Sequence, residues 1–152
     1  MSNQTTYVAL AILYRQNQFL LQLRDDIPDI RYPGHWGLFG GHIEPGETPD
    51  DAIQRELMEE ICYILPQLSK FGSYSTNDSQ VVRHIFHAPL TVEVSQLILQ
   101  EGWDLSLFAP KQIRQGSGYS VKAERICPLA PPAQQVLLDF FEQTGISENG
   151  AF

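Results

Sequence analysis

The chain has 152 residues, of which 43% are hydrophobic and 11% aromatic; these ordinary proportions predict one globular domain with a substantial core. Its net charge is −8 and its lysines (Lys70, Lys111 and Lys122) are scattered, which argues against nucleic acid as a partner. No apolar run is long enough to span a membrane, and no basic segment precedes the apolar residues near the N-terminus, so we expect a cytoplasmic protein.

The first forty residues predict strands. Apolar, β-prone residues at 6–14 and 18–24 flank a polar turn and predict a β-hairpin. A charged loop follows, and the segment 32–39 predicts a turn that leads into a short strand. This strand ends at Gly40 and Gly41, adjacent glycines that permit a sharp turn and a close approach by other groups.

A helix is predicted from residue 49 to about residue 62. Thr48 is a good N-cap, Pro49 suits the first helical position, and two aspartates follow at the positive end of the helix dipole. The face to be buried carries apolar residues one turn apart, namely Ile53, Leu57 and Ile61.

An adjacent face of this helix is acidic. Glu56, Glu59 and Glu60 fall within an arc of about 100°, where three carboxylates repel one another. The pattern is favourable if a hard divalent cation binds there, because Mg²⁺ prefers oxygen ligands. The alternative is an ordinary solvated acidic face.

The second half of the chain predicts more strands and a closing helix. Strands are expected at 67–76, 81–87, 90–94 and 103–108, with a turn at 77–80 and a further short piece at 97–101. A helical turn at 110–113, a flexible loop at 114–122 and a helix at 131–143 complete the prediction. We expect a single α+β domain over residues 1–146 and a flexible tail at 147–152. Cys62 and Cys127 are expected to be reduced and buried.

The spacing around the acidic helix resembles the signature of the Nudix hydrolases. Gly41, five residues, Glu47, seven residues and then the run RELMEE at 55–60 match the box G-x5-E-x7-R-E-U-x-E-E-x-G-U, in which U is aliphatic. The match departs at Cys62, where the family has glycine, and at Tyr63, where it has an aliphatic residue. The resemblance implies the family's α/β/α sandwich with a mixed central sheet, in a MutT-like member.

The resemblance also implies a metal site. Glu56 and Glu60 would be the most direct Mg²⁺ ligands, with Mn²⁺ able to substitute. Glu59 would be a further ligand or a base, and the carbonyl of Gly40 would be another ligand.

Two further roles come from the same resemblance. Glu47 and Arg55 would pair as a brace of the site. A carboxylate downstream of the box, Glu101 in preference to Asp104, would complete the metal site or act as general base; an ordinary surface acid is the equal alternative for Glu101.

Two residues near the box are candidates for substrate binding. Trp36 is a candidate for stacking on a nucleobase, although a core tryptophan is the stronger interpretation. Arg24 is a candidate for contacting a phosphate, and a loop salt bridge with Asp25 or Asp26 is the equal alternative.

The resemblance implies attack by water at phosphorus in a nucleoside diphosphate linked to another group X. A nucleoside triphosphate, in a house-cleaning role, is the first expectation for this small-molecule partner, and a nucleotide sugar is the next. The alternative is a non-catalytic nucleotide-binding or regulatory protein on the same scaffold. A homodimer is left open.

Overall fold

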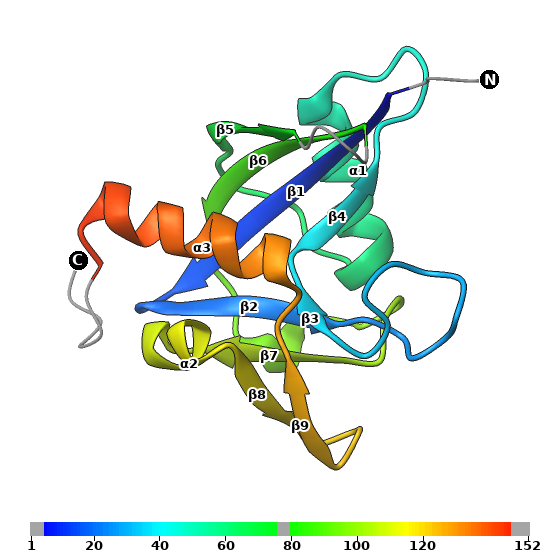
Figure 1. Ribbon diagram of the computed structural model, residues 1–152. Helices are drawn as coiled ribbons and strands as arrows, with labels where there is room; N and C mark the ends of the chain where they lie inside the picture. The colour runs from blue at the N-terminus through cyan, green and yellow to red at the C-terminus, as the bar shows by residue number, and fades with distance from the viewer. Residues whose placement is uncertain (1–4, 76–79, 147–152) are drawn as a thin grey trace.

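The computed structural model describes residues 5–75 and 80–146, so the tail predicted at 147–152 and most of the turn predicted at 77–80 lie outside the described residues. At its centre is a mixed seven-stranded sheet (Figure 1). Its strands are β1 (Thr6–Arg15), β2 (Gln18–Leu23), β3 (Trp36–Gly37), β4 (Phe39–His42), β5 (Ser69–Ser75), β6 (Val81–Pro89) and β7 (Asp104–Phe108).

Strand β1 organises the sheet because it pairs with three other strands. It runs parallel to β6 along nearly its whole length, and β6 pairs in turn with β5. On its other edge β1 is shared, with its middle part paired to β4 and its end paired to β2. β2 continues to β3 and β7, and all pairs other than β1–β6 are antiparallel.

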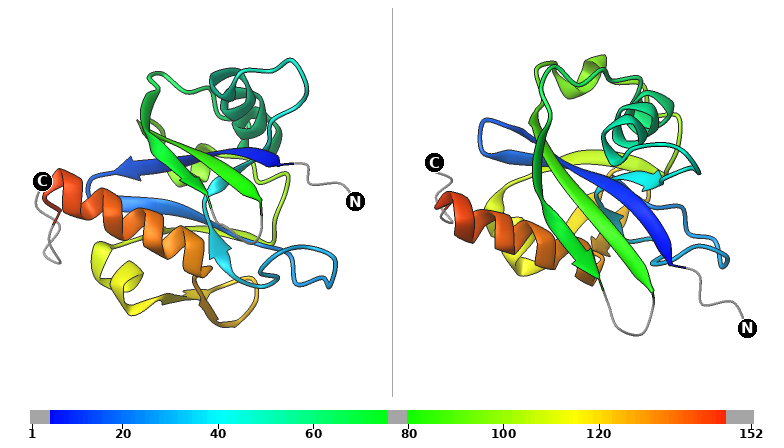
Figure 2. Two further views of the ribbon diagram at one scale, coloured as in Figure 1. Left: turned by 45° about the horizontal axis from the view of Figure 1, so that its top comes forward. Right: turned by 90° about the horizontal axis from the view of Figure 1, so that it is seen from above.

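Helices cover both faces of this sheet, as the two turned views show (Figure 2). The remaining elements are α1 (Pro49–Ile61), the 3₁₀ turn η1 (Val94–Gln96), α2 (Pro110–Gln115), the two-stranded sheet of β8 (Ser117–Ser120) and β9 (Arg125–Pro128), and α3 (Pro131–Thr144). Two apolar clusters result, one under α1 and one under α3. The predicted α/β/α sandwich with a mixed central sheet is confirmed. Among the described helices, none has the length and apolarity needed to cross a membrane.

The ends of α1 follow from its local sequence. Thr48 caps the helix, its Oγ1 accepting a hydrogen bond from the backbone N–H of Asp51 at 3.1 Å. The helix ends at Cys62, which adopts the left-handed conformation at φ 55° and ψ 39°. This is the position where the Nudix signature has glycine, the residue that takes this conformation without steric cost. Cys62 is exposed, so the expectation that both cysteines are buried is wrong for Cys62 and right for Cys127.

The first hairpin forms without glycine in its turn. Gln16 and Asn17 both have positive φ, 52° and 65°, which matches the right-handed twist of the flanking strands. The predicted strands at 6–14 and 18–24 are therefore confirmed to within a residue.

Three predictions in the second half are wrong. The segment 90–94 is not a strand but an irregular connection to η1, and 97–101 is not a strand because its backbone bonds to the end of α1. The loop predicted at 114–122 instead contains the end of α2 and strand β8, which pairs with β9. The glycines at 116 and 118 suggested flexibility, but the ring of Phe108 packs where a Cβ of Gly118 would lie.

Candidate active site

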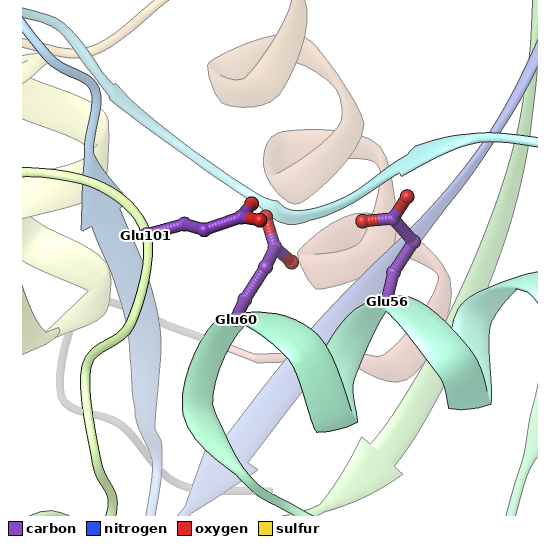
Figure 3. A group of neighbouring side chains, drawn as sticks. All are labelled: Glu56, Glu60 and Glu101. Atoms are coloured by element: carbon purple, nitrogen blue, oxygen red, sulfur yellow. The ribbon is translucent and has the colours of Figure 1, made fainter.

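Three carboxylates converge between α1 and the loop that precedes β7. Glu56 and Glu60 come from successive turns of α1, and Glu101 comes from the loop; their side chains point toward one another (Figure 3). One oxygen from each lies within 4.8 Å of the others. Three carboxylate oxygens at this separation are a donor set that suits a hard cation such as Mg²⁺, so the residues fit the expected metal.

Glu60 is the most buried of the three, with 4% of its surface exposed. Its Oε1 accepts a hydrogen bond from the backbone N–H of Gly40 at 2.8 Å. Burial, reinforced by the charges of Glu56 and Glu101, raises the pKa of Glu60 to about 8 despite that hydrogen bond. Burial is also the first cause of the raised pKa of Glu56. A bound cation would supply the positive charge that these ionised acids need.

The loop that carries Glu101 is tied to the end of α1 and to β2. The backbone N–H of Gln100 donates to the carbonyl of Glu60 at 2.8 Å, and that of Trp103 donates to Leu23. Gln22, a buried residue of β2, donates through Nε2 to the carbonyl of Glu101 at 3.1 Å. These contacts bring Glu101 into the cluster.

Asp104, the other downstream acid considered, forms its hydrogen bonds outside the carboxylate cluster. It is buried, and its Oδ2 accepts a hydrogen bond from Ser120 Oγ at 2.7 Å. Its position favours Glu101 over Asp104 as the third carboxylate.

The two glycines before the helix make room for the cluster. Gly40 has φ 137°, and a Cβ there would collide with the backbone of Ala9 in β1. A Cβ at Gly41 would lie 2.5 Å from Oε1 of Glu56. A larger residue at Gly40 would push β4 away from β1, so glycine is required there; a larger residue at Gly41 would instead displace the carboxylate of Glu56 from its position in the cluster.

Arg55 is the hub of an ion-pair network beside the cluster. Its Nε donates to Glu47 Oε2 at 2.7 Å, and its Nη2 donates to Glu47 Oε1 and to the carbonyl of His42. Its Nη1 donates to Glu56 Oε1 at 3.2 Å. The pairing of Glu47 with Arg55 that the resemblance implies is present, and it links the glycine loop to a carboxylate of the cluster.

Glu59 lies outside the carboxylate cluster. Because residues four apart stack along a helix, Glu59 lies over Arg55, whereas Glu60 lies over Glu56. Arg55 Nη1 donates to Glu59 Oε1 at 3.1 Å, and the Glu59 side chain is 50% exposed. The structure thus brings together Glu56, Glu60 and Glu101, and it does not bring Glu59 with them.

Substitution Glu47→Gln is expected to weaken binding of Mg²⁺ about 10- to 100-fold, because Arg55 loses the ion pair that holds it against Glu56. Isothermal titration with Mg²⁺ measures the affinity, and circular dichroism checks the fold. Glu44→Gln is the matched control, since Glu44 is more exposed and lies 3.9 Å from Arg55. Equal Mg²⁺ affinities for wild type and Glu47→Gln would remove the bracing role.

The cluster opens into a cavity of about 670 Å³ on the side of the sheet that carries α3. Arg24 lines this cavity and donates from Nε to the carbonyl of Arg31 at 2.7 Å. Among the described residues Arg24 forms no ion pair; Asp26 pairs instead with Arg125. Its place in the cavity favours the phosphate-contact interpretation over the loop salt bridge.

Trp36 is not available to a nucleobase. It is 0% exposed, its ring packs edge-on against Phe108, and its Nε1 donates to the carbonyl of Gly118 at 3.0 Å. The stacking role considered for Trp36 is therefore corrected to a core role, because both ring faces are covered by protein.

Four residues of the cavity were missed from sequence. They are Gln22, which bonds to Glu60 and to the Glu101 loop, and three that line the wall, namely Arg31, Tyr32 and Arg83. Tyr32 precedes Pro33–Gly34, and this sequence predicts a turn but not a position in a binding cavity. Arg83 sits in a strand that alternates normally, so nothing local distinguishes it.

The fold and the site define a protein that presents a cluster of three carboxylates beside a cavity of about 670 Å³. The family model described as the NUDIX domain matches residues 4–126, which is most of the chain. This protein belongs to the Nudix family, and the resemblance of its 41–63 segment is confirmed.

Curated relatives match parts of the chain. It is 34% identical over 80 residues to a candidate 8-oxo-dGTP diphosphatase of Bacillus subtilis (strain 168), covering 53% of this chain and 50% of that protein. It is 32% identical over 93 residues to the ADP-ribose pyrophosphatase of Methanocaldococcus jannaschii, covering 61% of this chain and 53% of that protein. A 30-residue stretch is 53% identical to nucleoside triphosphatase NudI of Enterobacter sp. (strain 638), covering 20% of this chain and 21% of that protein. The chain thus matches about half the length of these relatives, or less.

Solved structures agree on the fold. A NUDIX hydrolase from Nitrosomonas europaea aligns over 95% of this chain and 74% of that chain, with a TM-score of 0.72 and 20% identity. A MutT NUDIX hydrolase from Burkholderia pseudomallei aligns over 90% of this chain and 98% of that chain, with a TM-score of 0.68 and 21% identity.

Proposed function

We propose that this protein is a metal-dependent hydrolase of the pyrophosphate bond in a nucleoside diphosphate linked to a group X. The observation that carries the proposal is the convergence of Glu56, Glu60 and Glu101 at one end of a nucleotide-sized cavity. The names of the relatives, which include diphosphatases and a nucleoside triphosphatase, support the same reaction class.

Each residue of the site has a task in this reaction. Glu56 and Glu60 would hold Mg²⁺, with the Gly40 carbonyl alongside. When bound, the cation would draw charge from the pyrophosphate oxygens and lower the pKa of a water. Arg24 would donate to a phosphate oxygen from the cavity wall.

The general base is one of two carboxylates. Glu101, which is exposed at the mouth of the cluster, would accept the proton of the attacking water or serve as a third ligand. Glu59 is the other candidate, although its hydrogen bond with Arg55 makes it a weaker acceptor than Glu101.

We rank nucleoside triphosphates first among the substrates. The relatives named for 8-oxo-dGTP and nucleoside triphosphates support this order, and the relative named for ADP-ribose adds that compound to the nucleotide sugars as the next group. We also propose a cytoplasmic location; a homodimer is left open.

A substrate panel tests the function. With Mg²⁺ and excess substrate, we expect release of a nucleoside monophosphate, measured by chromatography, from at least one compound among the nucleoside triphosphates, nucleotide sugars, ADP-ribose and dinucleotides. Removing the metal with EDTA should abolish the release, and adding back Mg²⁺ or Mn²⁺ should restore it. Hydrolysis in H₂¹⁸O followed by mass spectrometry identifies the phosphorus that water attacks.

The same panel separates the enzyme from a non-catalytic binder. A binder would take up nucleotide in an equilibrium titration and release no nucleoside monophosphate from any compound. Activity that persists in excess chelator would overturn the role of the metal.

A further inference from the structure

Two arginines line the cavity away from the carboxylates. Arg31 lies in the loop between β2 and β3, and Arg83 lies on β6. Neither guanidinium makes a hydrogen bond or ion pair with any residue that the structure describes; the bond recorded for Arg31 uses its backbone carbonyl. Arginine side chains in a cavity that lack a protein acceptor have all their donors available to a ligand.

The register of the sheet places Arg83 relative to the carboxylates. Arg83 pairs with Val8 of β1, and Val8 pairs on its other edge with His42 of β4. Two strand spacings, about 10 Å, therefore separate the backbone of Arg83 from the end of β4, where Gly41 packs against Glu56. The backbone of Arg83 is thus about one nucleoside length from the strand end beside the carboxylates.

The cavity between these two ends is largely apolar. Alternate residues of β1 and β6 face α3, as the burial of Ile85 in the cluster under that helix shows. The cavity lining includes Val8 and Leu10 from β1 and Ala133 and Val136 from α3. This surface suits the ribose and base of a nucleotide better than it suits further phosphates.

The far end of the cavity is electrostatically unbalanced. Burial, and next the positive charge of Arg31, lower the pKa of Arg83, so the two guanidiniums are close enough to repel each other. Asp25 and Asp29 also line the cavity, but neither forms an ion pair with these arginines. Pro132 and Ala133, near the start of the 14-residue helix α3, also line the cavity. An anion between the arginines would remove the repulsion.

We propose that Arg31 and Arg83 bind a phosphate monoester that the substrate carries outside its scissile pyrophosphate. The inference rests on the proposed function for its reaction. Within that reaction it favours substrates with a second, separated phosphate over the plain nucleoside triphosphates ranked first above. The phosphate belongs either to the ribose, at its 2′ or 3′ position, or to the group X. A phosphate dianion matches two guanidiniums in charge and in hydrogen-bond geometry.

The test compares ligands that differ by one phosphate. Isothermal titration with Ca²⁺ in place of Mg²⁺ measures the binding of AMP, adenosine 2′,5′-bisphosphate and adenosine 3′,5′-bisphosphate. For a phosphate on X, ADP-ribose 1″-phosphate is compared with ADP-ribose. We expect at least one phosphate-bearing ligand to bind about 10- to 100-fold more tightly than its partner, the range for charged hydrogen bonds.

Arg83→Gln and Arg31→Gln should each remove most of this preference while leaving the affinity for AMP or ADP-ribose, the members of each pair without the extra phosphate, unchanged. Arg15→Gln is the matched control, because it removes the same charge from the first hairpin, away from the cavity. Circular dichroism verifies folding, and Arg31 is exposed, so its substitution leaves the core intact.

Two results would overturn the inference: no preference in the wild type, or an equal loss for both members of a pair in the arginine variants. The second result would mean that the arginines hold the base or the scissile phosphates. A phosphate preference in a protein that hydrolyses neither the panel nor its counterparts with the extra phosphate would uphold the subsite and refute the proposed function, so the two failures are distinguishable.

Discussion

Glu60→Gln is expected to reduce turnover by about 100-fold or more while leaving the chain folded. Loss of a residue that merely orients a metal ligand costs about 10- to 100-fold, so loss of a direct ligand should reach at least the upper end of that range. Glutamine can still accept the hydrogen bond of Gly40, and it places no ionisable group in the buried position. Steady-state kinetics with Mg²⁺ on the best panel substrate, together with a thermal melt in EDTA, measures both effects.

Two other substitutions sharpen this result. Glu142→Gln removes an exposed carboxylate from α3 and should leave turnover unchanged. Glu59→Gln should have a smaller effect than Glu60→Gln, because Glu59 lies outside the cluster and contacts Arg55. A loss for Glu59 as large as that for Glu60 would place Glu59 among the ligands, and a near-normal rate for Glu60→Gln would refute the assignment of Glu60.

The metal-free protein should lose stability as the pH rises from about 5 to about 8. In this range the folded protein retains a proton on Glu60, whose pKa is about 8, whereas the unfolded chain has released it near the ordinary value of 4.5. The folded state therefore binds more protons, and the free energy of unfolding falls with increasing pH by an amount on the order of a few kcal/mol. The raised pKa of Glu56 acts in the same direction.

Bound Mg²⁺ should reverse this trend, because the cation replaces the proton as the partner of the ionised carboxylates. Thermal denaturation across pH 5–8 in EDTA and in Mg²⁺ measures the difference, at roughly 2–4 °C for each kcal/mol. Glu60→Gln should flatten the EDTA curve, since it lacks the group that titrates. A melting temperature in EDTA that is constant or rises over this range would contradict the burial of an ionisable Glu60.

Much of the site was predictable because it is local. The cap at Thr48 and the stacking of Glu56 with Glu60 depend on hydrogen bonds and side-chain spacing within a few residues, which the periodicity of the sequence encodes. The contact of Arg55 with Glu47 spans eight residues across a single turn, and the Nudix resemblance was sufficient to predict it.

Only the tertiary structure decided which other side chains join the site. Glu101 reaches Glu60 because Gln22, 79 residues away in the chain, bonds to its carbonyl, and no sequence spacing encodes such a contact. The sequence alone determined the acidic helix and the glycine loop, since their geometry is set by hydrogen bonds between near neighbours. The pairing of β1 with β4 and β6 placed Arg83 in the same cavity as the carboxylates, because it fixes the order and register of these strands. The packing of β8 and Phe108 against Trp36 buried that side chain, because the contacts come from segments far apart in the chain.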